Sequence, residues 1–506
     1  MAEASWHPTP QLDWVKRAST LRLEIVNLVN GNERAPSGAK LLEKFNPRDG
    51  KLLYQFQTSM HEDVDSAVAA ARDAFSDGRW WRQSVQCRAE ALLRLAALIE
   101  QHREEFALLE SLDTGKPIRD AFQFDVPRAI ATLKFCAAAA DKTPGQVYGA
   151  DLTSLSFQSR RALGVVGGII GWNFPLVLAA EKIGPALAMG NSIVLKPSEL
   201  TSLSAVMLGR LAMQSGIPEG VLNILHGGST VGDALARHRD VDMITFTGSS
   251  QTGRRLLVAA GNTNMKRLLL ECGGKAPNIV FDDAPDLRAV ASGVVARAFW
   301  NQGQVCTASS RLLVHKSVKE ELMGLVLECT SVFFPGDPLR VDTSFGALVS
   351  AGHREKVLGY IETAKADGAT LLTSEDSRGP LPGGYYVEPA IFDEVSRDRR
   401  IAQEEIFGPV LAVLTFADDD DAVSIANGTI YGLSAILWTT DLSRAHRISQ
   451  AINAGWVVVN GTATPRGGPG AGILSIGGHQ QSGFGLEGGL DGLRAYTRET
   501  AIQFFT

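Results

Sequence analysis

Short apolar segments alternate with longer, helix-like segments in the middle of the chain. A helix-like stretch runs from Leu176 to Met189, and another begins at Ser202. The apolar segments between and beyond them read "NSIVLK" (191–196), "VLNILH" (221–226), "DMITFT" (242–247) and "RLLLE" (267–271). Strands this uniformly apolar do not suit a sheet with one face in water. The pattern therefore predicts an α/β fold with a parallel sheet covered by helices on both faces.

An uncharged stretch precedes these segments. It runs from Ala162 to Ala180, "ALGVVGGIIGWNFPLVLAA", and its length is near that of a membrane-spanning helix. Its glycines and the central "WNFP" divide it into two shorter pieces. We interpret it as a buried strand, a sharp turn and a helix, and we predict no membrane span.

Composition and charge narrow the class of partner. The 506 residues, 45% of them hydrophobic, can form two or three domains with substantial cores. The net charge of -6 and a pI near 5.9 give no reason to expect a surface that binds nucleic acid or acidic membranes. We therefore expect a small-molecule partner.

The cysteines and the N-terminus indicate the compartment. Five cysteines is an odd number, and none of them has paired metal-ligand spacing, which predicts a reducing environment without disulfides or a metal site. The N-terminal residues contain no apolar core of the kind a secretory signal needs. We expect a cytoplasmic protein.

Each predicted strand is followed by a loop with polar or small residues: "WNFP", "KPSE", "HGGS", "FTGS" and "ECGG". Ligands of parallel sheets bind beyond the carboxyl ends of the strands. Gly248 and Ser249 stand at a helix N-terminus, where free backbone N–H groups can hold a pyrophosphate, although a serine-capped turn would look the same. Lys196 and Glu199 could reach an adenosine ribose or form a solvated surface pair.

Longer motifs carry a resemblance to a known family. The chain resembles the aldehyde dehydrogenase superfamily over nearly its whole length, and most of all the gamma-glutamyl-gamma-aminobutyraldehyde dehydrogenase branch. The matching stretches are "LDTGKPI" (112–118), "GWNFP" (171–175), "GPALAMGNSIVLKPSE" (184–199), "FTGSSQTG" (246–253), "LLLECGGKAPNIVF" (268–281), "NQGQVC" (301–306) and "EEIFGPV" (404–410).

The resemblance implies the catalytic residues. Cys306 matches the family's nucleophile, Glu271 its general base and Asn173 its oxyanion-stabilising amide. A lone cysteine is by default an inert buried thiol, but these roles suit the chemistry of aldehyde oxidation. A thiolate attacks the aldehyde, the amide stabilises the resulting oxyanion, and the carboxylate activates the water that hydrolyses the thioester.

The resemblance also implies the cofactor and substrate contacts. NAD is expected rather than NADP, because Glu199 would accept hydrogen bonds from ribose hydroxyls and repel a 2′-phosphate. Glu405 is expected at the nicotinamide ribose and Phe407 beside the ring. The implied cofactor contacts are Ile170, Trp172, Lys196, Ser198, Glu199, Gly228, Phe246, Gly248, Ser249, Glu405 and Phe407. The implied substrate-pocket residues are Asp125, Glu181, Val305 and Thr307.

Three interleaved domains follow from the same resemblance. A Rossmann-type NAD-binding domain is expected from 1–141 and 163–271, and an α/β catalytic domain from 272–484. A small β oligomerisation domain is expected from 142–162 and 485–506. Homodimers or homotetramers are implied.

Two departures from the family pattern concern the substrate. The loop over 461–476 is several residues longer than is common, with Ser475 and Ile476 in place of a Pro-Phe pair and Gln480 in place of a lysine. Glu181 stands where relatives often have tryptophan and where succinic semialdehyde enzymes have arginine. Together with Asp125 it would attract a cationic tail, as in an aminoaldehyde or a compound like gamma-glutamylaminobutyraldehyde. Alternatively, Glu181 pairs with Lys182, Arg210 or another cation, and an apolar or aromatic aldehyde is the substrate.

Two other function classes fit less well. A CoA-acylating aldehyde dehydrogenase would use the same thiol but typically lacks the glutamate base. A catalytically silent protein of this fold would be expected to lose Cys306, Asn173 or Glu271. Of the other cysteines, we expect Cys272 to serve in packing, and Cys87, Cys136 and Cys329 to lie in the core. The acidic run from Asp418 to Asp421 is expected to begin a helix.

Overall fold

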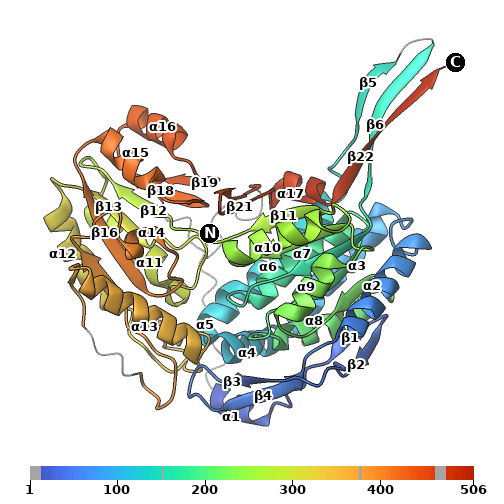
Figure 1. Ribbon diagram of the computed structural model, residues 1–506, viewed down its shortest axis with the longest axis horizontal. Helices are drawn as coiled ribbons and strands as arrows, with labels where there is room; N and C mark the ends of the chain where they lie inside the picture. The colour runs from blue at the N-terminus through green and yellow to red at the C-terminus, as the bar shows by residue number, and fades with distance from the viewer. Residues whose placement is uncertain (1–12, 151–152, 375–378, 462–473, 506) are drawn as a thin grey trace.

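The computed structural model describes residues 13–150, 153–374, 379–461 and 474–505, and its largest sheet has eight strands (Figure 1). Strands β9, β8, β7, β10 and β11 are parallel, as predicted, and the outer strands are antiparallel. The order across the sheet is β2 (Asn32–Arg34), β1 (Asn27–Val29), β9 (Leu222–Ile224), β8 (Ser192–Lys196), β7 (Val165–Ile169), β10 (Met243–Thr247), β11 (Arg267–Glu271) and β21 (Gly483–Phe484).

Helices cover both faces of this sheet, which confirms the expectation from its apolar strands. Along β7, Val165 and Ile169 pack into one core, whereas Val166 packs into the other. The first core includes residues of α2 (His61–Ser76), α9 (Ser229–Arg237) and α10 (Ser250–Gly261). The second core includes residues of α3 (Val85–Gln101), α4 (Arg103–Thr114), α6 (Val126–Ala139), α7 (Pro175–Ala188) and α8 (Leu203–Gln214).

The second sheet has seven strands and carries most of the chain after β11 (Figure 1). Its order is β14 (Thr370–Leu371), β15 (Ala390–Asp393), β16 (Val410–Phe416), β13 (Arg311–His315), β12 (Pro277–Val280), β18 (Ser434–Trp438) and β19 (Trp456–Val459). Its helices are α11 (Leu287–Phe299), α12 (Lys319–Thr330), α13 (Ala351–Ala366), α14 (Arg400–Gln403), α15 (Asp419–Asn427) and α16 (Leu442–Ala451). Asp418 caps α15 by accepting from the Asp421 amide at 2.9 Å, so the acidic run begins a helix as predicted.

A third sheet of three strands projects from the body of the molecule (Figure 1). It consists of β22 (Thr497–Phe505), β6 (Ser154–Ala162) and β5 (Gln146–Ala150) in that order. The remaining elements are α1 (Trp14–Thr20), the hairpin β3 (Leu41–Phe45) and β4 (Leu52–Gln57), α5 (Ile118–Asp120), a π-helical turn (Ala121–Asp125), a 3-10 turn (Trp300–Gly303), β17 (Tyr431–Gly432), β20 (His479–Gln480) and α17 (Gly489–Ala495).

Within the described ranges, no helix has the length and apolar character to cross a membrane. The same residues form no cluster of three or more His, Cys, Asp or Glu side chains that could hold a metal ion. Cys272 and Cys136 are buried, as expected. The expectation for Cys87 is wrong: it is exposed, because it lies in the first turn of α3 on the side away from the core. Cys329 is half-buried.

Candidate active site

The order of the eight-stranded sheet brings the predicted residues to one edge. The chain runs from β7 outward through β8 to β9, then returns to β10 and β11 on the other side of β7. Such a switch point opens a crevice at the carboxyl ends of the strands. Asn173 follows β7, Lys196 ends β8, Ser249 follows β10 and Glu271 ends β11.

A left-handed turn presents Cys306. Asn301, Gln302 and Gly303 have φ angles of 50°, 57° and 69°, and two of these three residues are not glycine. Left-handed backbone costs a non-glycine residue about 1–2 kcal/mol, so surrounding contacts must hold this turn. Gln304 makes two of these contacts. Its backbone N–H donates to the Asn301 carbonyl at 3.0 Å, and its side-chain Oε1 accepts from the backbone N–H of Val349 at 3.0 Å.

Asn173 is buried and directed at the same turn. Its Nδ2 donates to the Gln304 carbonyl at 3.0 Å, two residues before the thiol. A side-chain amide has two N–H groups, so this contact leaves a second donor. The Asn173 carbonyl accepts from Lys116 Nζ at 3.0 Å and from Asn301 Nδ2 at 3.3 Å. Backbone and side chain of Asn173 are therefore both fixed relative to Cys306.

The Cys306 thiol is half-buried, and its surroundings keep it neutral. Burial above all, together with the negative charges of Glu271, Glu405 and Glu181, raises its pKa to about 12, while the Thr307 amide opposes the shift. A positive charge placed against the sulfur would favour the thiolate instead.

Glu271 lies at the end of β11 and interacts electrostatically with two charged residues, Lys182 and Glu487, for which the sequence predicted no role in catalysis. Burial raises the pKa of Glu271 well above its usual value, the Glu487 carboxylate raises it further, and Lys182 lowers it. Lys182 is fully buried and forms an ion pair with Glu487. Lys182 sits on α7, nine residues after Asn173, and Glu487 precedes α17, so only the three-dimensional fold joins them to Glu271.

The Glu405 side chain lies against the "ECGG" loop (271–274). Its Oε1 accepts from the Gly274 amide at 2.9 Å. A Cβ atom at Gly273 would lie 2.2 Å from Glu405 Oε2, and one at Gly274 would lie 2.5 Å from the Cys306 carbonyl oxygen. Both glycines are thus needed for this close approach. Burial raises the pKa of Glu405.

Phe407 and Trp172 meet across the same crevice. Their ring centroids are 5.1 Å apart at an interplanar angle of 86°. Phe407 has a φ of 62°, and His353 Nε2 lies 2.7 Å from its carbonyl oxygen, which fixes this unusual backbone. Ile170 and Lys196 are joined by the Ile170 amide, which donates to the Lys196 carbonyl at 3.2 Å.

The residues beyond β8, β9 and β10 fit a dinucleotide. Lys196 Nζ lies 3.3 Å from Glu199 Oε2, so the two predicted ribose contacts face one another. A Cβ atom at Gly228 would lie 3.9 Å from Glu199 Oε1, which brings the "HGGS" loop beside that carboxylate. Ser249 is exposed and caps α10, accepting from the Thr252 amide at 3.2 Å, next to Gly248 and the buried Phe246. Ser198 is buried.

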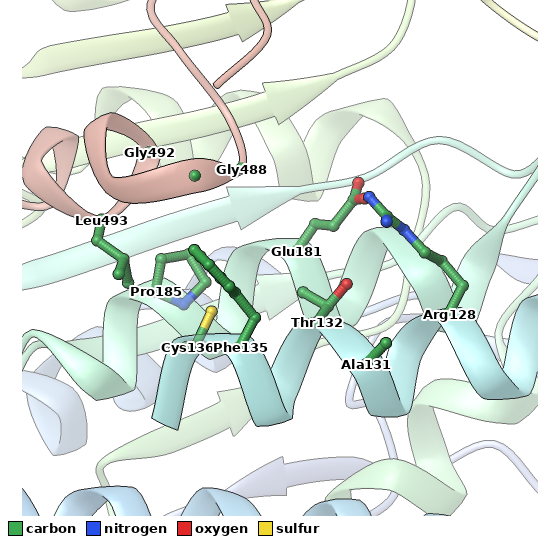
Figure 2. Close-up of a pocket in the computed structure, with 11 residues that line it drawn as sticks. Arg128, Ala131, Thr132, Phe135, Cys136, Glu181, Pro185, Gly488, Gly492 and Leu493 are labelled. Carbon is green, nitrogen blue, oxygen red and sulfur yellow. The ribbon is translucent and has the colours of Figure 1, made fainter. Parts of the chain in front are cut away.

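Two of the predicted substrate-pocket residues lie next to Cys306, and a third forms an ion pair on the helices (Figure 2). Val305 and Thr307 flank Cys306 and are half-buried. Glu181 is part-exposed, and its Oε1 lies 3.4 Å from Arg128 Nη2, so it pairs with a cation as the alternative prediction allowed, although that cation is neither Lys182 nor Arg210.

Asp125 does not face the pocket in the way we expected. Its side chain is 0% exposed and forms an ion pair with Lys116, which also holds the Asn173 carbonyl. The carboxylate therefore supports Asn173 from behind, because the π-helical turn directs it inward. Of the longer loop at 461–476, residues 462–473 lie outside the described residues. Ile476 exchanges two backbone hydrogen bonds with Glu487, at 2.8 and 2.7 Å.

Comparison with known proteins gives a consistent result. The model of the aldehyde dehydrogenase family matches residues 34–502. An aminoacetaldehyde dehydrogenase of Pseudomonas aeruginosa is 44% identical over 469 residues, which cover 92% of this chain and 93% of that protein.

Two solved structures are similar over nearly the whole chain. A mutant of P. syringae AldA, an indole-3-acetaldehyde dehydrogenase, in complex with NAD+ and IAA, has a TM-score of 0.95 and 44% identity, covering 98% of this chain and 99% of that one. A gamma-glutamyl-gamma-aminobutyraldehyde dehydrogenase from Burkholderia cenocepacia has a TM-score of 0.94 and 42% identity, covering 97% and 99%.

Proposed function

Because this chain belongs to the aldehyde dehydrogenase family, we propose that it oxidises an aldehyde to its carboxylic acid with NAD, through a covalent intermediate on Cys306. The observation that carries the proposal is the convergence of Cys306, Asn173 and Glu271 at the edge of the sheet where the dinucleotide residues also lie.

In the first step the Cys306 thiol loses its proton to water, and the thiolate sulfur forms a bond with the aldehyde carbon as the carbonyl π bond breaks. The carbonyl oxygen becomes an oxyanion, which the free N–H of the Asn173 amide and the Cys306 backbone N–H can stabilise. One such donor contributes about 3–4 kcal/mol in comparable sites. When bound, NAD+ supplies the acceptor for the hydride that leaves the carbon. Cys306 then holds the acyl group as a thioester.

Glu271 acts in the second step. As a carboxylate it takes a proton from a water molecule, whose oxygen attacks the thioester carbon and releases the acid and the Cys306 thiolate. One oxygen of Glu271, Oε1, is buried and accepts no hydrogen bond from a described residue, so it is available to that water. The presence of this base disfavours a CoA-acylating reaction.

The residues Lys196 and Glu199 support NAD as the cofactor, and the names of the relatives support particular classes of aldehyde substrate. Similar structures are complexes with NAD+, and Glu199 beside Lys196 supports NAD over NADP in this chain. The relatives named for aminoacetaldehyde and gamma-glutamyl-gamma-aminobutyraldehyde support an aldehyde with a nitrogen-bearing tail. The relative named for indole-3-acetaldehyde supports the alternative, an aromatic aldehyde.

The projecting sheet supports a homodimer or homotetramer. Val147, Tyr148, Phe504 and Phe505 on this sheet are 69%, 66%, 55% and 78% exposed. Apolar side chains on an open three-stranded sheet favour association. We propose that this sheet and α17 correspond to the oligomerisation domain at 142–162 and 485–506. We also propose that the other two domains have the boundaries expected from the sequence and that the enzyme is cytoplasmic.

The experiment is NADH formation with a panel of aldehydes, measured by absorbance for the wild type and for Cys306→Ala. The wild type should oxidise at least one aldehyde. The alanine variant should lose at least about 10⁴-fold in kcat, since the thiol makes the only covalent bond to substrate, yet it should still bind NAD. Substantial NADH production by Cys306→Ala would contradict the proposal.

A further inference from the structure

Two buried ionisable residues hold the segment that carries Asn173. Lys116 Nζ donates to the Asn173 carbonyl at 3.0 Å and lies 4.2 Å from the centroid of the Phe174 ring. Glu110 Oε1 accepts from the Leu176 amide at 3.1 Å, in the first turn of α7. These contacts fix the backbone from Asn173 to the start of α7, and thus the direction in which the Asn173 side chain points.

The end of α4 brings the two groups together. Glu110 lies in the second half of α4, and the helix ends at Gly115, whose φ of 79° turns the chain back. Across this turn, Ser111 Oγ donates to the Lys116 carbonyl at 2.7 Å. A Cβ atom at Gly115 would lie 2.7 Å from the Ala347 carbonyl oxygen, so both the space and the backbone conformation require glycine.

Asp125 completes a buried cluster with Glu110 and Lys116. Asp125 Oδ2 forms the ion pair with Lys116, and a hydrogen bond joins the Asp125 and Glu110 carboxyl groups. Glu110 and Asp125 are 0% exposed, and Lys116 is 1% exposed. If both acids were ionised, Glu110 Oε2 and Asp125 Oδ1 would be buried without a donor among the described residues. The cluster would also carry a net negative charge away from water, and one proton removes both penalties.

We propose that Glu110 is protonated and donates to Asp125, and that the cluster positions the Asn173 amide for the reaction. This inference rests on the proposed function. Glu110 holds the Asp125 carboxylate, which in turn holds Lys116 on the Asn173 carbonyl. The three members of the cluster are positioning residues, because they act on the thiol and its oxyanion only through Asn173.

The surroundings of Glu110 favour its protonated form at neutral pH. Burial above all, together with the negative charges of Asp125 and Asp113, raises the pKa of Glu110 to about 8. Lys116 and the Ser204 hydroxyl of α8 oppose this shift. Burial raises the pKa of Asp125 as well, but Lys116 and Glu110 lower it, so the proton belongs on Glu110. As pH rises through about 8, Glu110 ionises and two adjacent carboxylates share one ammonium.

Glu110→Gln tests the proton through activity. A glutamine keeps an oxygen for the Leu176 amide and an N–H for Asp125, as a protonated glutamate does, but it does not ionise. At pH 7 this variant should lose less than about twofold in kcat, whereas Glu110→Ala should lose at least about tenfold. The ratio of wild-type kcat to Glu110→Gln kcat should fall as pH rises through about 8. Glu105→Gln, at a part-exposed position of the same helix, is the control and should follow the wild type at each pH.

A second measurement of the proton needs no substrate. Because the pKa of Glu110 is raised from 4.5 to about 8 on folding, folding takes up a proton between these pH values. The stabilisation linked to that proton is complete at low pH and is lost as pH rises through about 8. The thermal midpoint of the wild type, relative to that of Glu110→Gln, should therefore fall across this range and stay constant above it.

A double-variant cycle tests whether the cluster acts through Asn173. Lys116→Met removes the donor to the Asn173 carbonyl and should lower the single-turnover rate of NADH formation at least about tenfold, with KM for NAD changed less than about twofold. In an Asn173→Ala background no side-chain amide is left to position, so Lys116→Met should add less than about twofold. If the thermal midpoint shows that Lys116→Met does not fold, Glu110→Ala takes its place in the cycle.

Three results would overturn the inference. The first is a Glu110→Gln variant that loses as much kcat at pH 7 as Glu110→Ala, because the ionised carboxylate would then be the working form. The second is a difference in thermal midpoint that does not change with pH. The third is an equal loss in the presence and absence of the Asn173 amide, which would make the cluster structural. Each leaves the proposed function intact, whereas a wild type that oxidises no aldehyde of the panel contradicts that function while the thermal midpoints still test the proton.

Discussion

The proposed cofactor side and the proposed substrate side of Cys306 are built in different ways. On the cofactor side, the groups come from strand ends and the loops that follow them, as Lys196, Ser249 and Glu271 do. On the substrate side, they come from helices that are distant in sequence, as Arg128 and Glu181 do. The first arrangement is fixed by backbone, while the second depends on which side chains three packed helices present. The catalytic residues can therefore be retained while the side chains on the proposed substrate side change.

After the loss expected for Cys306→Ala, the largest effect should come from Glu271→Gln, because this carboxylate lies where the proposed cofactor and substrate sides meet. Without the carboxylate, hydrolysis of the thioester should slow by about 10²–10⁴-fold, whereas formation of the thioester needs the thiol, its oxyanion donors and NAD+ as hydride acceptor, but not this carboxylate. Rapid mixing should show a burst of NADH followed by a slow steady state, and intact-mass spectrometry should detect the acylated chain.

A matched control identifies the adduct. The double variant Cys306→Ala with Glu271→Gln should show neither burst nor mass shift, because the acyl group has no acceptor. If Glu271→Gln turned over at the wild-type rate without an adduct, another residue would have to act as the base.

Sequence patterns predicted the strands and loops of the proposed cofactor side because their determinants are local. The parallel strands end within a few residues of their predicted limits, and each is followed by the loop that was expected to bear ligand groups. Gly273 and Gly274 illustrate why such motifs contain glycine. Gly273 permits the close approach of Glu405, and Gly274 permits that of the Cys306 carbonyl.

The substrate side could not be predicted to the same degree. Glu181 was identified, but its partner Arg128 lies on another helix, and no spacing in the chain relates the two. Asp125 was assigned to the pocket, yet a π-helical turn directs it inward to Lys116. The pairing of Lys182 with Glu487 was missed for the same reason: this ion pair joins positions 305 residues apart.

A smaller effect, on pH dependence, should distinguish Lys182 from Glu487. Glu271 must lose its proton to act as a base, and its pKa is raised, so hydrolysis should become faster as pH rises through that pKa. Lys182→Met removes a positive charge and should move this rise to higher pH by about one unit. Glu487→Gln removes a negative charge and should move it to lower pH by a similar amount.

Steady-state kcat measured against pH, with the thermal midpoint of each variant as a check on folding, gives the two shifts. Opposite shifts would show that the pair adjusts the basicity of Glu271 electrostatically. Shifts in the same direction, or a uniform loss of kcat at every pH, would show that the Lys182–Glu487 ion pair serves to hold α7 against the segment before α17.

The smallest expected effect is on cofactor choice and concerns the outer end of the cofactor side. Glu199 faces Lys196 at 3.3 Å, and a 2′-phosphate would bring a second negative charge against that carboxylate. In Glu199→Gln the repulsion is absent while Lys196 keeps its positive charge, so the preference for NAD over NADP should fall by about five- to tenfold, a difference near 1 kcal/mol.

The ratio of kcat/KM for the two cofactors, measured with one saturating aldehyde, gives this change directly, and Glu219→Gln, at an exposed position outside the site, is the control. Because the substitution leaves the predicted substrate-pocket residues unchanged, the ranking of aldehydes should stay constant. A change in that ranking would show that the two sides of Cys306 are coupled, and an unchanged cofactor ratio would show that Glu199 turns away from the ribose when cofactor binds.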